Sequence, residues 1–260
     1  MIKKILRFLG HHVPDIRYLR AIPNRILKPL HKAAGLGGGV VEVMGFKMRL
    51  NPQECVDGWL WFSPHLYDRV EIDFLLKVFP PEGVFLDVGA NIGFWSLRFA
   101  HANPSARVFT IEANPVTFQV LNENIKINHF ENVMSIQVGV SDTVDELSLY
   151  CNVTGNRGGD SFSSYAESRK DAVKVNVKPL AHIFCEAGIT KVDVMKMDIE
   201  GFEERVLRSF FQDVPQSSWP QYICAEILHA TEIVELLQEK GYQICVRSRE
   251  NSVFKLLVSV

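Results

Sequence analysis

Polar residues and glycines follow a short apolar run, Val84–Val88, at a spacing that suits a nucleotide-type ligand. The segment reads Asp87-x-Gly89-x-Asn91-x-Gly93. A dinucleotide site has Gly-x-Gly-x-x-Gly, in which the backbone approaches a pyrophosphate at a helix N-terminus. Here asparagine stands at the second glycine position, and the last glycine comes one residue early. Asparagine tolerates a left-handed backbone and adds side-chain hydrogen bonds, so the turn admits a close ligand but does not fit a pyrophosphate.

Acidic residues stand at the ends of the next two apolar runs. Glu112 ends the run 107–111, where a carboxylate can accept hydrogen bonds from both ribose hydroxyls. Ser141 and Asp142 end the run 133–140, where an acceptor could meet an adenine amine. Taken singly, Glu112 and Asp142 could be ordinary loop residues. At successive strand ends, and in this order, they predict a nucleoside site.

Four segments of the chain together resemble one enzyme family. They are Phe85-Leu86-Asp87-Val88-Gly89-Ala90-Asn91-Ile92-Gly93, Ile111-Glu112-Ala113-Asn114-Pro115, Gly139-Val140-Ser141-Asp142 and Lys196-Met197-Asp198-Ile199-Glu200-Gly201-Phe202-Glu203. They are similar to the FkbM family of S-adenosylmethionine-dependent methyltransferases, over roughly residues 40–260. The resemblance implies a class I methyltransferase fold, a seven-stranded sheet with its last strand antiparallel, and methylation of hydroxyl groups, often on sugars or polyketide-type natural products. It places the following residues at cofactor-binding positions: Asp87, Gly89, Asn91, Gly93, Glu112 and Asp142.

The residues that could act on the methyl acceptor follow two later apolar runs. Methyl transfer from a sulfonium depends strongly on positioning, and an alcohol acceptor also needs a general base. Asp198 and Glu200 follow the run 192–197, and His229 follows the run 222–227. A carboxylate that ends a buried strand is costly without a role or partner, and an imidazole accepts a proton near neutral pH. We therefore expect Asp198 and His229 to act on the acceptor and Glu200 to orient it.

Each of these residues also has a plainer interpretation. His229 could be exposed at a helix cap, and Glu200 and Glu203 could complement the N-terminus of a helix. The acids and the histidine could instead hold a divalent cation. No ligand spacing in the chain indicates a metal site, so S-adenosylmethionine is the cofactor that we expect.

Alternating strands and helices after Gly83 position these residues. The expected strands are 84–88, 107–111, 133–140, 192–197 and 222–227, and the intervening segments have helical lengths. Asn114 and Pro115 should open one helix, and Gly241 should end another. Such an order requires a parallel sheet with helices on both faces. The tail, 242–247 and 253–260, predicts an antiparallel hairpin, which completes a Rossmann-like α/β fold.

The chain is expected to divide into three parts. Residues 1–39 form a basic helical extension with a Gly-rich linker, residues 40–82 a β-hairpin (40–50) and a helix (65–79), and residues 83–260 the core. The irregular stretch 151–171 contains a segment, 156–161, similar to a Gly/Ser-rich loop of the family. Together with residues 40–70 it should build the acceptor pocket. Five aromatic residues in 59–67 could stack on a sugar, although a core role is favoured: Trp59, Trp61, Phe62, His65 and Tyr67.

Charge is unevenly distributed along the chain. The net charge is −2, but residues 1–35 carry eight Lys or Arg against Asp15 alone. The acidic remainder lacks the basic footprint of a nucleic-acid-binding protein. Residues 1–9 predict an amphipathic helix with Ile2, Ile5, Leu6 and Leu9 on one face. We expect this helix to dock on its own domain; the alternative is weak contact with an anionic membrane surface or a partner.

Other functions stay open from the sequence. The acceptor could be an amine or a carboxylate, or the chain could be a non-catalytic binding module. A nicotinamide dehydrogenase is disfavoured by the glycine spacing. The five scattered cysteines predict a reducing, cytoplasmic location. The oligomeric state and the identity of the acceptor, a glycan or a small molecule, are not indicated.

Overall fold

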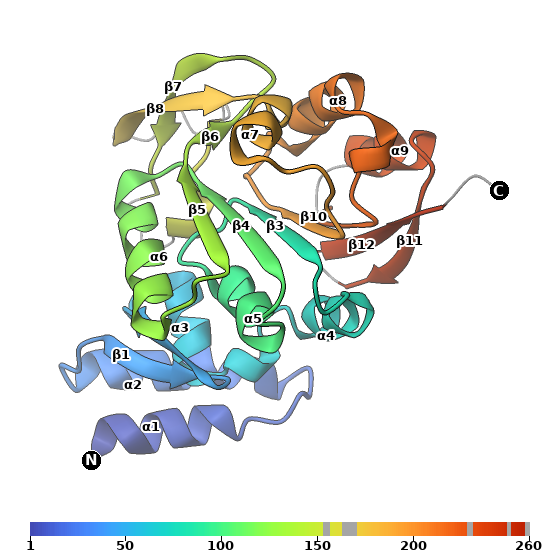
Figure 1. The fold of residues 1–260 in the computed structure, drawn as a ribbon. Coiled ribbons are helices and arrows are strands. Elements are labelled where there is room, and N and C mark those ends of the chain that lie inside the picture. Colours follow the sequence, from blue (N-terminus) through green and yellow to red (C-terminus); the bar gives the residue numbers. More distant parts are fainter. Residues whose placement is uncertain (153–156, 163–170, 228–230, 249–250, 258–260) are drawn as a thin grey trace.

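A seven-stranded sheet forms the centre of the computed structural model, which describes residues 1–152, 157–162, 171–227, 231–248 and 251–257 (Figure 1). Its strands are β3 (Val84–Val88), β4 (Arg107–Glu112), β5 (Val133–Gln137), β9 (Val194–Met197), β10 (Tyr222–Glu226), β11 (Tyr242–Arg247) and β12 (Asn251–Leu256). Their order is β11-β12-β10-β9-β3-β4-β5, and β12 runs antiparallel to both of its neighbours. The predicted class I methyltransferase sheet with a terminal hairpin is confirmed.

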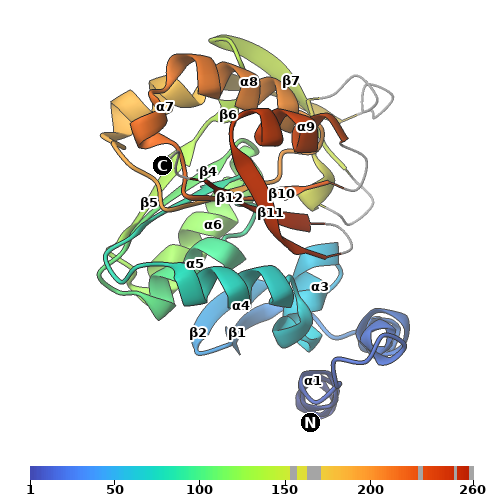
Figure 2. The same ribbon diagram turned by 90° about the vertical axis from the view of Figure 1, so that its right-hand side faces the viewer.

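Helices cover both faces of this sheet (Figure 2). One face carries α4 (Arg69–Val78), α5 (Phe94–Ala102) and α6 (Pro115–Asn128), and the other carries α7 (Leu180–Ala187), α8 (Glu203–Asp213) and α9 (Thr231–Glu239). Alternate strand residues face opposite layers. Leu86 packs with the α7–α9 layer, whereas the Phe85 ring stacks on Phe99 of α5 at 4.0 Å between centroids. Since both faces are covered, β3 is buried throughout, as its continuous apolar run predicts.

A second, three-stranded sheet replaces part of the third predicted strand. It contains β6 (Gly139–Val140), β7 (Asp145–Tyr150) and β8 (Ala172–Lys178) in the order β6-β8-β7. The single strand expected over 133–140 is therefore wrong. The chain leaves the main sheet after Gln137, and β6 pairs with β8 instead. Because β7 and β8 are antiparallel, they hold the two ends of the stretch 151–171.

An N-terminal layer packs beneath α5 and α6 (Figure 1). It comprises α1 (Ile2–His11), η1 (Leu19–Ala21), η2 (Pro23–Leu27), α2 (Lys28–Ala33), β1 (Gly39–Val43), β2 (Phe46–Leu50), α3 (Cys55–Phe62) and η3 (Pro64–Leu66). The hairpin predicted over 40–50 is present as β1 and β2. Asn124 of α6 ties it to the core, because its side chain accepts from the Arg49 N–H and donates to the Ile92 carbonyl.

The structure shortens one element expected in residues 40–82 and supports the core interpretation of two aromatic residues. The helix predicted over 65–79 begins only at Arg69, because Asp68 takes a left-handed conformation (φ 44°) and breaks the run. The core interpretation of the aromatic residues holds for Trp61 and Phe62, which are fully buried. Within the described parts of the chain, every helix is too short or too polar to cross a membrane.

Candidate active site

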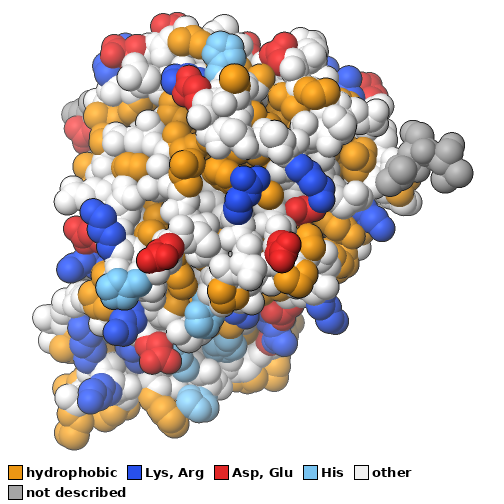
Figure 3. Space-filling view, viewed as in Figure 1, with side chains coloured by type: hydrophobic (Ala, Val, Ile, Leu, Met, Phe, Trp, Pro, Cys, Tyr) orange, Lys and Arg blue, Asp and Glu red, His pale blue; other side chains and the backbone are white. Residues whose placement is uncertain are grey.

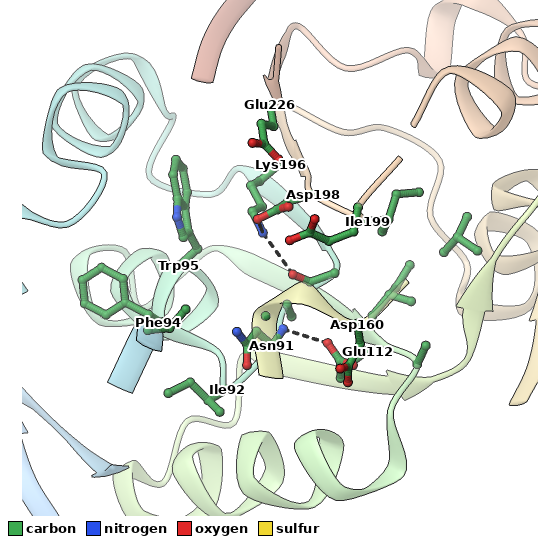
Figure 4. A pocket seen from close by; sticks show the side chains of 18 of the residues that line it. Asn91, Ile92, Phe94, Trp95, Glu112, Asp160, Lys196, Asp198, Ile199 and Glu226 are labelled. Atoms are coloured by element: carbon green, nitrogen blue, oxygen red, sulfur yellow. Dashed lines mark hydrogen bonds and ion pairs between the residues drawn. The ribbon is translucent and has the colours of Figure 1, made fainter. Parts of the chain in front are cut away.

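A cavity opens at the carboxyl ends of β3, β4 and β9 (Figure 4). The strand order reverses here, since β4 lies on one side of β3 and β9 on the other. Open α/β sheets bind ligands at this position. Asn91 and Glu112 lie on one side of the cavity, and Lys196 and Asp198 on another. The N-terminal layer closes the cavity with Tyr67 and Asp68.

The turn after β3 is fixed by a close backbone contact. Gly89 has φ +77°, and a Cβ at this position would lie 1.9 Å from the carbonyl oxygen of Asp198. Only glycine allows so close an approach to the end of β9. Asn91 is left-handed (φ 51°), as an asparagine in such a turn can be, and Gly93 (φ 90°) precedes α5. The turn therefore presents backbone directly to the cavity.

Asp87 lies beneath this turn and is fully buried. Its Oδ2 accepts hydrogen bonds from the Ser96 N–H at 3.2 Å and the Ser96 hydroxyl at 2.6 Å. Its Oδ1 lies 3.8 Å from Lys196 Nζ. Burial raises the pKa of Asp87, although the Lys196 ammonium opposes this. Asp87 is not among the residues that line the cavity; its hydrogen bonds to Ser96 tie the end of β3 to the first turn of α5.

Lys196 lines the cavity and was not singled out by the sequence reasoning. Its ammonium donates to the Gly89 carbonyl at 3.0 Å and pairs with Asp198 Oδ2 at 3.2 Å. Burial by itself would lower the pKa of Lys196, but the carboxylates of Asp198 and Asp87 outweigh it and raise the pKa above its ordinary value. A single lysine inside an apolar strand was the available signal, because a buried ammonium needs partners. Lys196 thus joins β9 to the turn.

Glu112 and Asp160 lie together on one wall (Figure 4). Glu112 accepts from the Asn91 N–H at 2.9 Å and from the Asn114 N–H at 2.8 Å. Burial raises the pKa of Glu112 to about 7, although both N–H groups favour the charged form. Asp160 accepts from Asn114 Nδ2 and from the Asn152 N–H, each at 2.7 Å. The stretch 151–171 therefore supplies the second carboxylate of this wall.

Ser141 and Asp142 are not brought to the cavity. Ser141 is buried and donates to Asp142 Oδ1, and Asp142 pairs with Arg205 Nε of α8 at 2.6 Å. The reason is the departure of the chain from the main sheet after Gln137, which brings Gly139 to the cavity instead. The sequence predicted Asp142 at the end of one continuous strand over 133–140, but this strand is interrupted after Gln137.

Of the three residues expected to act on the acceptor, the structure describes Asp198 and Glu200. Asp198 and Glu200 both line the cavity, and the Glu200 carbonyl accepts from the Ser161 hydroxyl at 2.7 Å. The neighbouring Glu203 lies in the first turn of α8, as the plainer interpretation expects. Its carboxylate accepts from the N–H groups of Ile199 and Gly201 in the segment before the helix, and α8 has no side-chain cap hydrogen bond. His229 lies outside the described residues.

Asp68 is a second residue that sequence reasoning missed. Its left-handed backbone directs the carboxylate to Trp95 Nε1, which donates to Oδ2 at 2.9 Å. Burial raises the pKa of Asp68 to about 6, and the Trp95 hydrogen bond moderates this. A neighbouring hollow shares Tyr67, Asp68 and Asn251 with the cavity. Asp68 therefore stands where the two spaces meet.

The residues present fit a nucleoside-type cofactor. Asn91 Oδ1 is buried and has no hydrogen-bond partner among the described residues. Gly89 leaves backbone open to a close ligand, and Glu112 offers a carboxylate at the end of β4. Among the residues that the structure describes, no three His, Cys, Asp or Glu side chains gather as a metal ion would require.

Comparison with known proteins agrees with this geometry. Residues 87–244 match the family model of the methyltransferase FkbM domain. Methyltransferase sdnD of Sordaria araneosa is 27% identical over 217 residues, covering 70% of this chain and 80% of that protein. The 31-O-demethyl-FK506 methyltransferase FkbM of Streptomyces tacrolimicus is 28% identical and covers 63% and 74%. Hexuronic acid methyltransferase AglP of Haloferax volcanii is 27% identical and covers 65% and 66%.

Proposed function

Because the chain belongs to the FkbM family of S-adenosylmethionine-dependent methyltransferases, we propose that it methylates a hydroxyl group of a sugar or of a small natural product. The observation that carries this proposal is the carboxylate of Asp68 at the junction of the cofactor cavity and a second hollow. Relatives named for O-methylation of a natural product and for a hexuronic acid support it.

The cofactor side is assigned to the turn after β3 and to the acidic wall. The turn at Gly89 and Asn91 would receive the cofactor, and Glu112 and Asp160 would accept hydrogen bonds from its hydroxyl or amino groups. When bound, S-adenosylmethionine supplies a methyl group activated on a sulfonium. The protein then has to position the acceptor and remove a proton.

Asp68 is proposed as the group that takes the acceptor proton. A carboxylate whose pKa is raised to about 6 is a stronger base than an exposed one and is still charged at neutral pH. Asp198 is already engaged by Lys196, so it is proposed to position the acceptor together with Glu200. The participation of His229 stays a prediction.

The neighbouring hollow is proposed as the acceptor site. Trp59, Arg17 and Arg20 line it in addition to Tyr67 and Asp68. An aromatic face beside charged hydrogen-bonding groups suits a hydroxylated ring, which has an apolar face and polar edges. Trp59, Tyr67 and Asp68 fall within residues 40–70, where the sequence predicts part of the acceptor pocket, whereas Arg17 and Arg20 come from the N-terminal extension, which the prediction did not include. A cytoplasmic setting is also proposed, since no disulfide joins the five cysteines.

The experiment is methyl transfer from labelled S-adenosylmethionine to hexoses, hexuronic acids and cell extract, with products identified by mass spectrometry. A base-stable methyl ether supports the proposal, whereas label found only in a methyl ester or a methylamine contradicts it. Cofactor binding without any transfer would favour the non-catalytic alternative.

The base assignment has its own test. Asp68→Asn should lower kcat by about 10²- to 10⁴-fold with the Kd for cofactor nearly unchanged. The matched control is Asp73→Asn, an exposed carboxylate on α4, the helix that follows Asp68, which should keep wild-type kcat. Wild-type kcat should fall below about pH 6, following the pKa of Asp68. A normal kcat in Asp68→Asn would exclude Asp68 as the base.

A further inference from the structure

Helix α1 docks on the protein with its polar side. Lys3 Nζ donates to the Gly38 carbonyl at 3.1 Å, and Arg7 donates to the carbonyls of Trp61 and Glu42 at 3.2 and 2.8 Å. A Cβ at Gly10 would lie 2.3 Å from the Phe62 carbonyl oxygen, so the helix backbone rests directly on α3. Lys3, Arg7 and Gly10 lie on one face of the helix, together with the buried Leu6.

The apolar side of α1 faces away from the protein. Ile2, Ile5, Phe8 and Leu9 are each 49–62% exposed. A surface helix normally buries its apolar stripe against the core. The sequence predicts that Ile2, Ile5, Leu6 and Leu9 share one face, and docking of the helix is confirmed, but only Leu6 of that set is buried. We call the four exposed residues the α1 apolar face.

Two neighbouring segments of the N-terminal layer also expose apolar side chains. Ile26 of η2 and Leu30 of α2 are each 51% exposed, and η2 packs against α1. Both segments lie at the edge of the molecule farthest from α7–α9 (Figure 2). Hydrophobic side chains interspersed with Lys and Arg are visible along the lower edge of the surface (Figure 3). Exposed apolar groups gathered in this way mark an interaction site more often than groups that occur singly.

The positive charge of residues 1–35 favours an anionic partner. Residues 1–35 carry eight Lys or Arg against one acidic residue, whereas the remaining 225 residues carry 20 basic and 29 acidic ones. A second copy docked on the same face would bring two strongly positive segments together. Anionic lipid headgroups instead offer negative charge above a layer that receives apolar side chains. Lys4, which is exposed next to the apolar face, suits the headgroup level.

We propose that α1 lies in the headgroup interface of an anionic membrane, with the α1 apolar face inserted. A helix of 10 residues is about 15 Å long, half of the roughly 30 Å hydrocarbon thickness, so it lies along the surface and does not span it. This inference is independent of the acceptor and of the base.

The test is co-sedimentation of the full chain with phosphatidylcholine vesicles that contain 30 mol per cent phosphatidylserine, a composition of about one anionic lipid in three. Ile5→Gln/Phe8→Gln should weaken binding about tenfold or more, because two apolar side chains no longer enter the membrane. The matched control is Val116→Gln/Val144→Gln, which removes two similarly exposed side chains (65% and 61%) elsewhere and should bind as wild type does. Binding should weaken in pure phosphatidylcholine and in high salt.

Three results would overturn the proposal. The first is the absence of wild-type binding to the anionic vesicles at low salt, and the second is equal binding of Ile5→Gln/Phe8→Gln and wild type. The third is a concentration-dependent dimer in sedimentation velocity that this double variant abolishes, which would make the face a contact between copies. Far-UV circular dichroism and methyl transfer in solution verify that both double variants are folded.

Discussion

The contact between the cofactor turn and β9 can be tested with two glycine substitutions. Gly89 (φ +77°) and Gly188 (φ +64°) both have left-handed backbones, but a Cβ at Gly89 meets the Asp198 carbonyl oxygen at 1.9 Å, whereas one at Gly188 meets nothing within 4 Å. Gly188→Ala therefore isolates the conformational cost of alanine, about 1–2 kcal/mol. Gly89→Ala adds an overpacking cost of roughly 1–3 kcal/mol, because backbone has to move.

The expected losses follow from these terms. Gly188→Ala should lower the free energy of unfolding by about 1 kcal/mol and Gly89→Ala by about 3 kcal/mol. For a chain of this size each kcal/mol corresponds to roughly 2–4 °C in Tm. Urea unfolding gives the free energies, and calorimetric titration gives the Kd for S-adenosylmethionine. Gly188→Ala should bind normally and Gly89→Ala at least about tenfold more weakly, since its turn is displaced. Equal losses of stability, or an unchanged Kd in Gly89→Ala, would refute the reasoning.

Three further substitutions test the charged groups of the cavity. Burial raises the pKa of Glu112 to about 7, so the folded protein holds the Glu112 proton to a higher pH than the unfolded chain does. Between pH 4.5 and 7 the wild type should therefore lose about 3 kcal/mol of unfolding free energy relative to Glu112→Gln. Urea unfolding over this pH range measures the difference, and parallel plots of unfolding free energy against pH for the two proteins would contradict the prediction. Lys196→Met leaves the buried Asp87 without its cation and should cost about 3 kcal/mol of unfolding free energy. Because burial already raises the pKa of Asp87, the loss should be larger at high pH, where the carboxyl is charged, than at low pH; equal losses would argue against the pairing. Trp95→Phe removes a hydrogen bond that favours charged Asp68, so the acid limb of the pH–rate profile should move upward by about one pH unit. An unchanged acid limb would show that it does not report the titration of Asp68.

The cofactor turn was predictable because backbone geometry dictates its residue types. A left-handed position favours Gly or Asn, so Gly89, Asn91 and Gly93 are visible in the sequence before any contact is known. The parallel strands were predictable for a similar reason, since coverage on both faces requires continuous apolar runs. The main sheet and its switch point could be derived from these two patterns.

The rest depends on tertiary contacts that no local pattern encodes. Nothing in the run 133–140 marks the point after Gln137 where pairing changes from β4 to β8. Asp142 was therefore expected at a strand end facing the cofactor, whereas it pairs with Arg205 and does not line the cavity. Besides its sequence neighbour Asp198, Lys196 contacts Asp87 and the Gly89 carbonyl, which are distant in sequence and reach it only in the folded chain. The hydrophobic pattern of α1 identifies an apolar face, but it does not specify whether that face meets protein or another environment.

The tight approach of Gly89 to Asp198 also limits how this enzyme could be redesigned. At that point the backbone of Gly89 lies directly against the carbonyl of Asp198, so residue 89 has no room for a side chain. Around the hollow beside Asp68, in contrast, the walls are side chains of the N-terminal layer, such as Trp59 and Arg17. Selection for a new acceptor should therefore succeed through changes at those positions, whereas the cofactor side should tolerate almost none.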